Sequence, residues 1–387
     1  MAVTPAVPTA LAVTAPGLAA LCADELRALG LAIDLVDDAG VTFAATPEAL
    51  AQAHVGSAIA SRIVVRLAHF EARGFAELER HAKRVPWSRV LTAGRQVRLR
   101  VTSRKSKLYH TDAIAERLWP AIVAAGGVAN PAPVAADDDD DAVGADAAQL
   151  LVVRVHRDVV TISADASGAL LHRRGWRLAT AKAPMRETLA AALLAASGYD
   201  GRRPLVDPLA GSGTIGIEAA RQARGLLPGL DRGFAFEQWP AHDPAVLVRV
   251  RDAARAAALP HAPAAIVVND RDPGACEAIR ANAERAGVAR DLEVRQGPAS
   301  RLVLPEGPGW IITNPPYGKR VTGGDDPRDL YISLGRAWRA SAAGWRVALV
   351  GPSGMAQAFG LPLDDVLGTR NGGLAVAFSV GTVPRPT

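Results

Sequence analysis

The chain has 387 residues, of which 49% are hydrophobic, and this is enough for two or three domains that each bury a core. The formal net charge of +5 makes a polyanionic partner plausible, although a codon bias toward Arg explains most of the basic excess. Two cysteines far apart, Cys22 and Cys276, exclude a disulfide framework and a multi-cysteine metal site. Every long apolar run is interrupted by Gly, Pro or a charge, so we expect a cytoplasmic protein without a membrane span.

The first segment predicts a small α+β unit. The strand LAVTA leads through Pro16 and Gly17 into an apolar-periodic helix that ends at Gly30, and VTFAA predicts a returning strand. The apolar start contains three prolines and has no basic residue before Arg27, so we interpret it as a strand and helix rather than a signal peptide. We assign residues 1–74 to this α+β unit, which the family resemblance described below implies is ferredoxin-like.

A basic region follows. Residues 61–130 hold 14 Lys and Arg against 5 Asp and Glu. Within them RQVRLRVTSRKSKLYH alternates apolar and basic residues, and its end combines positive charge with rings that can stack on bases. This favours an RNA-contacting surface over the alternative of a solvated strand face. The candidate contacts are Arg104, Lys105, Lys107, Tyr109 and His110.

Residues 131–149 contain five consecutive Asp and no basic residue, which predicts a disordered acidic loop. The run LLVVRVHRDVVTISADAS then predicts two strands joined by a turn, which complete an RNA-binding α+β domain over residues 75–170. Residues 171–185 form a linker that carries the basic cluster LHRRGWR, so Arg173 and Arg174 join the candidate RNA contacts.

Residues 186–387 alternate strands with helices, which is typical of a parallel sheet covered on both faces, as in Rossmann-like domains. The predicted strands are PLVDP, AAIVVND, LEVRQ, GWIITN, WRVALV and LAVAFSV. The predicted helices are GTIGIEAARQARG, PGACEAIRANAERAG and DLYISLGRAWRASAAG.

A glycine turn marks a ligand site in this half. LVDPLAGSGT is a strand that ends at Asp207, a turn with Gly211 and Gly213, and a helix that begins near Thr214. The spacing fits neither the dinucleotide fingerprint nor the Walker loop. The next strand ends at Asp270, whose carboxylate can accept hydrogen bonds from both ribose hydroxyls. Helix capping by this residue is the alternative, but together with the turn it favours a nucleoside site.

IITNPPYG is the most informative stretch of the chain. A strand ends at Asn314, and Pro315 and Pro316 stiffen the backbone that follows. The lone pair of an exocyclic base amine is delocalised, and two acceptors beside the amine, the Asn314 oxygen and the Pro315 carbonyl, localise it on nitrogen. Tyr317 is expected to be displayed and to stack on an extruded base, although it can also pack in a structural turn.

The catalytic loop extends into a basic pair, Lys319 and Arg320, which suits flanking phosphates. Methyl transfer from a sulfonium is an in-line displacement, so most of the rate should come from alignment, and we expect no metal.

The chain resembles the THUMP-containing class I RNA methyltransferases, and most of all the amino-terminal half of the bacterial large-subunit ribosomal RNA guanine-N2 methyltransferases. The stretches that carry the resemblance are APGLAALCADELRALG, SKLYHTDAIAERL, SGALLHRRGWR, APMRETLAAALL, DPLAGSGTIGIEAA, LPGLDRGFAFEQW, TNPPYGKR and RNGGLAVAF. The implied fold is a Rossmann-like class I methyltransferase domain preceded by a ferredoxin-like and THUMP region.

The resemblance also implies a cofactor, a substrate and site residues. S-adenosylmethionine is the implied cofactor, held by Asp207, Pro208, Gly211, Ser212, Gly213, Thr214, Asp270 and Asn314. Asn314, Pro315, Pro316 and Tyr317 hold the target amine, and the implied base is guanine, with ribosomal RNA as substrate.

Two features depart from the family pattern. Gln296 and Gly297 stand where an acidic residue near the adenine is usual, so Gln296 or Ser300 must replace it. The chain also stops after the closing strand, which predicts a monofunctional enzyme, expected to be monomeric, and leaves a transfer RNA substrate open.

Three other functions stay open at this stage. The same loop can methylate adenine or a protein glutamine amide, but the basic first half argues against a protein substrate. A non-catalytic RNA-binding or assembly protein is the alternative of a different class, and the intact Asn-Pro-Pro-Tyr sequence argues against it.

Overall fold

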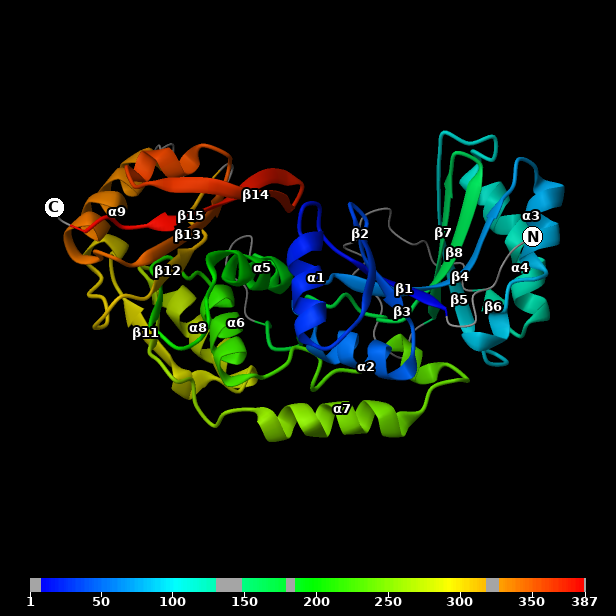
Figure 1. Ribbon diagram of the computed structural model, residues 1–387, viewed down its shortest axis with the longest axis horizontal. Coiled ribbons are helices and arrows are strands. Elements are labelled where there is room, and N and C mark those ends of the chain that lie inside the picture. The colour runs from blue at the N-terminus through cyan, green and yellow to red at the C-terminus, as the bar shows by residue number, and fades with distance from the viewer. Residues whose placement is uncertain (1–7, 130–147, 179–184, 318–326, 386–387) are drawn as a thin grey trace.

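The computed structural model describes residues 8–129, 148–178, 185–317 and 327–385. The acidic tract of residues 137–141, Lys319 and Arg320 lie outside the described residues. Two sheets organise the chain along its long axis, with the C-terminal half at one end and residues 75–165 at the other (Figure 1). None of the described helices is both long and apolar enough to cross a membrane.

The first sheet has eight strands in the order β2-β3-β1-β4-β8-β7-β5-β6. Its strands are β1 (Thr9–Val13), β2 (Ile33–Asp37), β3 (Gly40–Ala44), β4 (Arg62–Glu71), β5 (Gln96–Arg104), β6 (Val128–Ala129), β7 (Gln149–His156) and β8 (Val159–Asp165). Its helices are α1 (Ala19–Ala28), α2 (Pro47–Gly56), α3 (Phe75–Ala82) and α4 (Thr111–Ala124). The pairs of β5 with β6 and β7 are parallel, and the other pairs are antiparallel.

This single sheet crosses the domain boundary predicted at residue 74. β4 pairs with β1 on one side and β8 on the other, so hydrogen bonds join the predicted ferredoxin-like and THUMP units. The buried pair of Arg62 with Asp165 lies at this junction. The predicted loop end at residue 149 is wrong, because Gln149 is fully buried in β7 and accepts a hydrogen bond of 2.7 Å from the indole N–H of Trp239.

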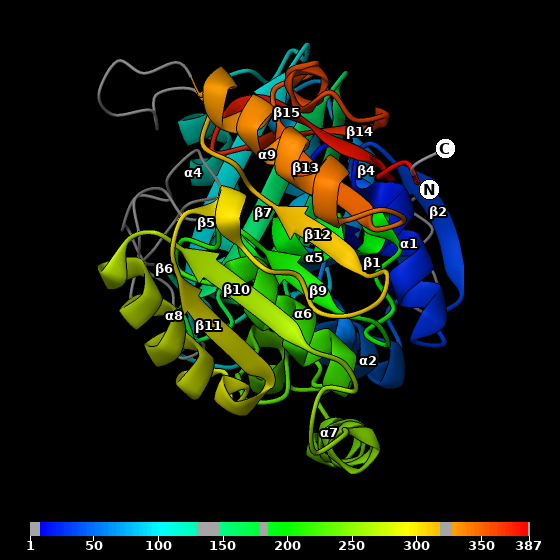
Figure 2. The same cartoon turned by 90° about the vertical axis from the view of Figure 1, so that its left-hand side faces the viewer.

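The second sheet has seven strands in the order β11-β10-β9-β12-β13-β15-β14 (Figure 2). Its elements are α5 (Glu187–Ser197), β9 (Leu205–Asp207), α6 (Thr214–Arg224), α7 (Pro244–Ala257), β10 (Ile266–Asp270), α8 (Pro273–Arg285), β11 (Leu292–Gln296), β12 (Trp310–Thr313), α9 (Arg328–Ser341), β13 (Arg346–Gly351), β14 (Leu363–Asn371) and β15 (Leu374–Thr382). Neighbouring strands among β11, β10, β9, β12 and β13 are parallel. β15 pairs antiparallel with β13, and β14 pairs antiparallel with β15. The predicted Rossmann-like fold is confirmed, with β14 as an added edge strand.

The hydrophobic cores show how the units are joined. One buried cluster includes residues of β1, α1 and α2 together with residues of the second sheet, whereas a separate cluster fills the region of α3, α4, β5 and β7. The ferredoxin-like unit therefore shares a sheet with one neighbour and a core with the other. Because both connections bury apolar or hydrogen-bonded surface, they hold the three units together.

Candidate active site

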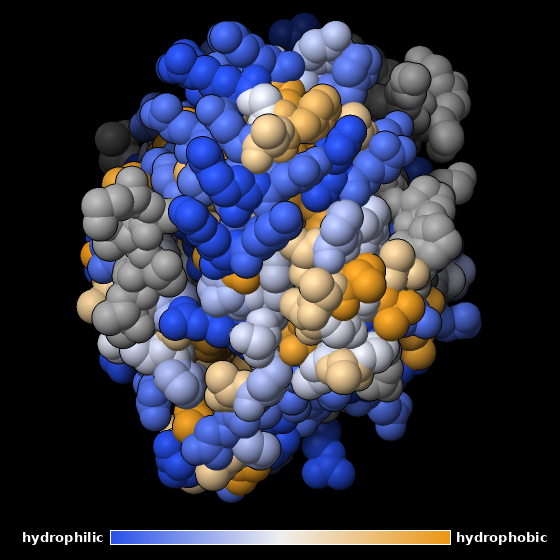
Figure 3. All heavy atoms as spheres, turned by 90° about the vertical axis from the view of Figure 1, so that its right-hand side faces the viewer, coloured by the Kyte–Doolittle hydropathy of each residue, from blue (hydrophilic) through white to orange (hydrophobic). Residues whose placement is uncertain are grey.

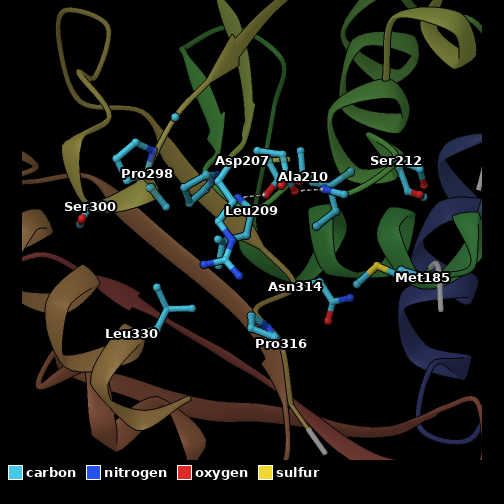
Figure 4. A pocket seen from close by; sticks show the side chains of 18 residues that line it. Met185, Asp207, Leu209, Ala210, Ser212, Pro298, Ser300, Asn314, Pro316 and Leu330 are labelled. Atoms are coloured by element: carbon cyan, nitrogen blue, oxygen red, sulfur yellow. Dashed lines mark hydrogen bonds between the residues drawn. The ribbon is translucent and has the colours of Figure 1, made fainter. Parts of the chain in front are cut away.

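A cavity of about 400 Å³ lies at the carboxyl ends of β9, β10 and β12 and beside the residues that follow β11. Parallel sheets place their ligands at this edge, and the volume is within the usual range for a cofactor-sized site. Figure 4 shows Asn314 and Pro316 across the cavity from Asp207 and Ala210. Pro298 and Ser300 lie at one end, and Met185 and Ser212 lie at the other.

Asn269 and Asp270 fix three strand ends relative to one another. The Asn269 amide nitrogen donates to the carbonyl oxygens of Pro208 and Gly297, both at 3.0 Å. The Asp270 carboxylate accepts from the backbone N–H of Gly211 at 2.9 Å and of Asp272 at 3.0 Å. The sequence pattern indicates Asp270 but not Asn269, whose partners lie in strands and loops far apart in the chain.

Asp270 does not cap the helix that follows it. The N-cap of α8 is Asp272, whose carboxylate accepts from the backbone N–H of Ala275. Asp270 instead lines the cavity, with both oxygens oriented by backbone donors. A carboxylate has about four acceptor sites, so it retains capacity for two ribose hydroxyls.

The glycine turn connects β9 to α6 with two left-handed residues. Gly211 has φ +55° and Gly213 has φ +86°. A β-carbon on Gly211 would project into open space. Gly213 lies behind the turn, where a β-carbon would be 3.1 Å from Ile279. Gly211, Ser212 and Thr214 line the cavity, so the N-terminus of α6 faces it and favours negative charge there.

Asp207 is buried at the floor of the site. Its Oδ1 accepts from the Thr313 hydroxyl at 2.7 Å and from the backbone N–H of Leu209 at 3.2 Å. Burial raises the pKa of this carboxyl to about 7, and these hydrogen bonds offset the effect only in part. The Thr313 contact ties β9 to the strand that carries Asn314.

The side chain of Asn314 provides an acceptor at the edge of the cavity. Its side-chain Oδ1 is buried and has no hydrogen-bond donor among the described residues, although the residue lines the cavity. The hydroxyl of Tyr331 on α9 donates to the carbonyl oxygen of Pro316 and holds the loop from behind. Pro208 and Pro316 line the cavity, whereas Pro315 is buried beside it.

The expectation that Tyr317 is displayed for stacking is wrong for this structure. Its side chain is 2% exposed, and its hydroxyl accepts a hydrogen bond of 2.7 Å from the amide of Asn371. The partner is a distant residue at the end of β14, so the local sequence gave no sign of it.

The region expected to hold the adenine follows β11. Gly297, Pro298, Ala299 and Ser300 line the cavity, and Gln296 is not among the described lining residues. Ser300 is therefore the better placed of the two predicted substitutes for the missing carboxylate. The structure adds further lining residues that were not among the predicted site residues: Met185, Leu209, Arg271 and Leu330.

The predicted RNA contacts divide into two groups. Arg104, Lys105, Lys107, Tyr109 and His110 are all exposed at the end of β5 and in the loop before α4. The rings of Tyr109 and His110 lie 4.1 Å apart between centroids, and Tyr109 is 68% exposed. Hydrophilic side chains cover much of the end of the molecule to which these elements belong (Figure 3).

Arg174 does not belong to an RNA surface, and its prediction is wrong. Its guanidinium donates to the Ala58 carbonyl at 2.7 Å and lies 3.5 Å from Glu218 on α6, and its side chain is buried. It therefore joins the ferredoxin-like unit to the second sheet. The neighbouring Arg173 is half-buried, and its carbonyl accepts from Arg232 at 3.2 Å.

The fold and this site define a class I methyltransferase. The strand order, the glycine turn, an acidic residue after the second strand and Asn-Pro-Pro-Tyr after the fourth are arranged around one cavity. The cavity offers oriented acceptors for a ribose and a helix N-terminus for a carboxylate, so its residues fit S-adenosylmethionine. Within the described ranges, no group of three His, Cys, Asp or Glu is arranged to hold a metal ion.

Comparison with known proteins agrees. The family profile described as "RMKL-like, methyltransferase domain" matches residues 174–359, and "RlmL ferredoxin-like domain" matches residues 9–64. The Ribosomal RNA large subunit methyltransferase K/L of Chromohalobacter salexigens is 33% identical over 382 residues, which covers 95% of this chain and 51% of that protein.

Solved structures extend the likeness to the whole chain. SMU.472, crystallised in complex with SAH, has a TM-score of 0.86 at 28% identity, covering 98% of this chain and 99% of that one. The "possible methylase" from Clostridium difficile 630 has a TM-score of 0.85 at 33% identity, with 98% and 99% covered.

The chain belongs to the RMKL-like methyltransferase family, and its cofactor is S-adenosylmethionine. It spans about half the length of the curated relatives it matches.

Proposed function

We propose that this chain transfers the methyl group of S-adenosylmethionine to the exocyclic N2 amine of a guanine in large-subunit (23S) ribosomal RNA. The observation that carries the proposal is the buried Asn314 Oδ1, which has no donor among the described residues and borders the cofactor cavity. A buried acceptor without a donor costs about 1–3 kcal/mol, and a target amine supplies that donor.

The Asn314 side-chain oxygen and the Pro315 carbonyl act on the amine by accepting hydrogen bonds from its two N–H groups. This draws the delocalised lone pair back to nitrogen. When bound, S-adenosylmethionine would supply the methyl group: the nitrogen–carbon bond would form as the carbon–sulfur bond breaks, S-adenosylhomocysteine would leave, and the amine would then lose a proton to water. The two acceptors stay in place because Thr313 donates to Asp207 at 2.7 Å and Tyr331 donates to the Pro316 carbonyl. Preorganised dipoles of this kind need no reorganisation during the reaction, so alignment contributes most of the rate.

RNA is the proposed substrate because of the exposed surface of Arg104, Lys105, Lys107, Tyr109 and His110. Cations bind phosphates, and exposed rings stack on unpaired bases. The curated relatives named for large-subunit ribosomal RNA support the choice of that RNA. Guanine rests on the family resemblance, and the assignment of residues 75–170 as a THUMP domain also stays a prediction.

Nucleoside mass spectrometry of ribosomal and transfer RNA, kept separate, tests the substrate. The comparison is between cells with and without this gene. We expect N2-methylguanosine to decrease in large-subunit ribosomal RNA only. Its loss from transfer RNA would transfer the activity to that substrate, loss of methyladenosine would overturn the base, and unchanged RNA would favour a non-catalytic binding protein.

Asn314→Ala tests the catalytic assignment. We expect kcat on ribosomal RNA from cells lacking the gene to fall about 100-fold or more, because one of two acceptors is lost. Affinity for RNA should stay within about threefold, measured by filter binding, since the phosphate contacts lie elsewhere. Full activity of this variant would contradict an enzymatic role for the loop.

A further inference from the structure

The side chains of Asn371 and Tyr317 form a buried contact beside the active site. Asn371 is the last residue of β14 and is 5% exposed, and its amide nitrogen donates to the Tyr317 hydroxyl at 2.7 Å. The ring packs near the end of β13, where a β-carbon on Gly351 would be 3.6 Å from ring atom Cδ1. The aromatic residue of the catalytic loop is therefore held away from solvent.

A ring in this position has no free face for a base. Tyr317 is 2% exposed, whereas Tyr109, which faces solvent, is 68% exposed. Stacking on an extruded base needs one full ring face, so the ring must leave its site when a base enters. Breaking a buried hydrogen bond opposes that movement, because both polar groups are desolvated until they find new partners.

We propose that Asn371 is a positioning residue for Tyr317: its side-chain amide holds the ring in a retracted position, and the ring is released to stack when the target base enters. The identity of that base rests on the proposed function. The retracted position itself is a property of the free protein, so it can be tested without RNA.

The strand that carries Asn371 is supported by the ferredoxin-like unit. A β-carbon on Gly17 would lie 2.1 Å from the carbonyl oxygen of Gly368, so the turn after β1 touches β14 directly. Leu367 on the same strand packs against the core shared by the two units. The retracted ring is thus held by a strand whose position depends on the ferredoxin-like unit.

Nitration of tyrosines by tetranitromethane, mapped by mass spectrometry, tests the contact in the free protein. The chain has four tyrosines, of which Tyr109 is exposed while Tyr199, Tyr317 and Tyr331 are buried. We expect Asn371→Ala to raise the nitration rate of Tyr317 about tenfold, because the buried phenol loses its donor. Tyr199 and Tyr331 should stay protected.

Thr369→Val is the matched control. Thr369 lies two residues earlier on β14, is buried to a similar degree, and has no hydrogen-bond partner for its hydroxyl among the described residues. Its removal should leave Tyr317 protected. Unchanged Tyr317 nitration in Asn371→Ala would overturn the proposal, and equal acceleration at Tyr199 and Tyr331 would do so too, because it would show general loosening.

Steady-state kinetics on ribosomal RNA from cells lacking the gene gives the second readout. We expect Asn371→Ala and Tyr317→Phe each to lower KM for RNA about fivefold or more, because each destabilises the retracted state that competes with base entry. The double variant should change KM by less than the sum of the two single effects, because both variants remove the same hydrogen bond. Additive effects, or a fall in kcat with unchanged KM, would overturn the proposal.

These outcomes separate the two proposals. If the wild-type protein methylates no RNA but Asn371→Ala raises Tyr317 nitration tenfold, the proposed substrate is refuted and the retracted ring is supported. If the wild-type protein methylates guanine but Asn371→Ala leaves Tyr317 nitration unchanged, the function is supported and the role of Asn371 is refuted.

Discussion

Asp207 gives the active site a pH dependence that can be measured without substrate. Its pKa is about 7 in the folded chain, against about 3.9 for an unfolded Asp. The folded state therefore binds more protons between roughly pH 4 and 7, and the free energy of unfolding falls as the pH rises through this window.

We expect Asp207→Asn to remove this pH-dependent loss of stability, because the amide does not ionise and its oxygen can still accept from Thr313 and Leu209. The unfolding free energy of the variant minus that of the wild-type protein should therefore be about 1–3 kcal/mol larger at pH 7.5 than at pH 4.5. Urea titrations of the cofactor-free protein at several pH values measure the difference. A difference that is constant with pH would show that Asp207 is ionised throughout.

At the residue scale, the sequence predicted the lining of the site better than the partners of its residues. Asp207, Gly211 and Asp270 follow strands in a recognisable motif, so their place at a sheet edge follows from topology alone. Arg174 and Tyr317 were misjudged because a basic or aromatic residue carries no local sign of burial. Their partners, Glu218 and Asn371, are brought to them only by the tertiary fold.

At the scale of elements, the contact between the β1–α1 turn and β14 predicts unequal effects for two similar glycines. Gly17 and Gly30 both have positive φ, +80° and +87°. A β-carbon on Gly17 would be 2.1 Å from the Gly368 carbonyl oxygen, whereas one on Gly30 would meet nothing within 4 Å.

We expect Gly30→Ala to cost about 1 kcal/mol of unfolding free energy, from backbone strain alone. Gly17→Ala should cost at least about 2 kcal/mol more, because the turn must also move away from β14. Denaturant titration of both variants measures the difference. An equal loss of unfolding free energy in both variants would mean that β14 can move away from the turn after β1, and that this contact does not fix its position.

Three of the elements that the sequence did not predict bury little apolar surface. β2 and β14 are edge strands with mostly exposed residues, so they lack the apolar alternation that marks a half-buried strand. α7 lies in an insertion and buries only Val246 and Leu247, which is too narrow a stripe for confident periodicity. Four of the predicted strands of the second sheet, β9, β10, β12 and β13, are apolar because both faces are covered.

At the scale of the whole molecule, the exposed basic surface predicts a salt-dependent interaction. Replacing Arg104, Lys105 and Lys107 together with Ala should weaken RNA binding and reduce the slope of log K against log salt by roughly 2 to 3. Affinity for S-adenosylmethionine should not change.

A matched triple variant controls for net charge. Arg27, Arg249 and Arg290 are exposed on other surfaces, and their replacement with Ala removes the same three charges. Filter binding at several salt concentrations compares the two variants. An equal reduction in slope for both would mean that RNA is attracted by overall charge rather than by the loop before α4.

The continuous eight-stranded sheet has a consequence for substrate choice. Hydrogen-bonded strands connect the basic surface to the ferredoxin-like unit, and a common core connects that unit to the cofactor site at the other end of the molecule (Figure 1). If the proposed function holds, a span built in this way keeps the distance between the basic surface and Asn314 nearly constant. An RNA would be selected by the distance between the helix or loop that anchors it and the base that reaches Asn314, with little need to read the sequence between them.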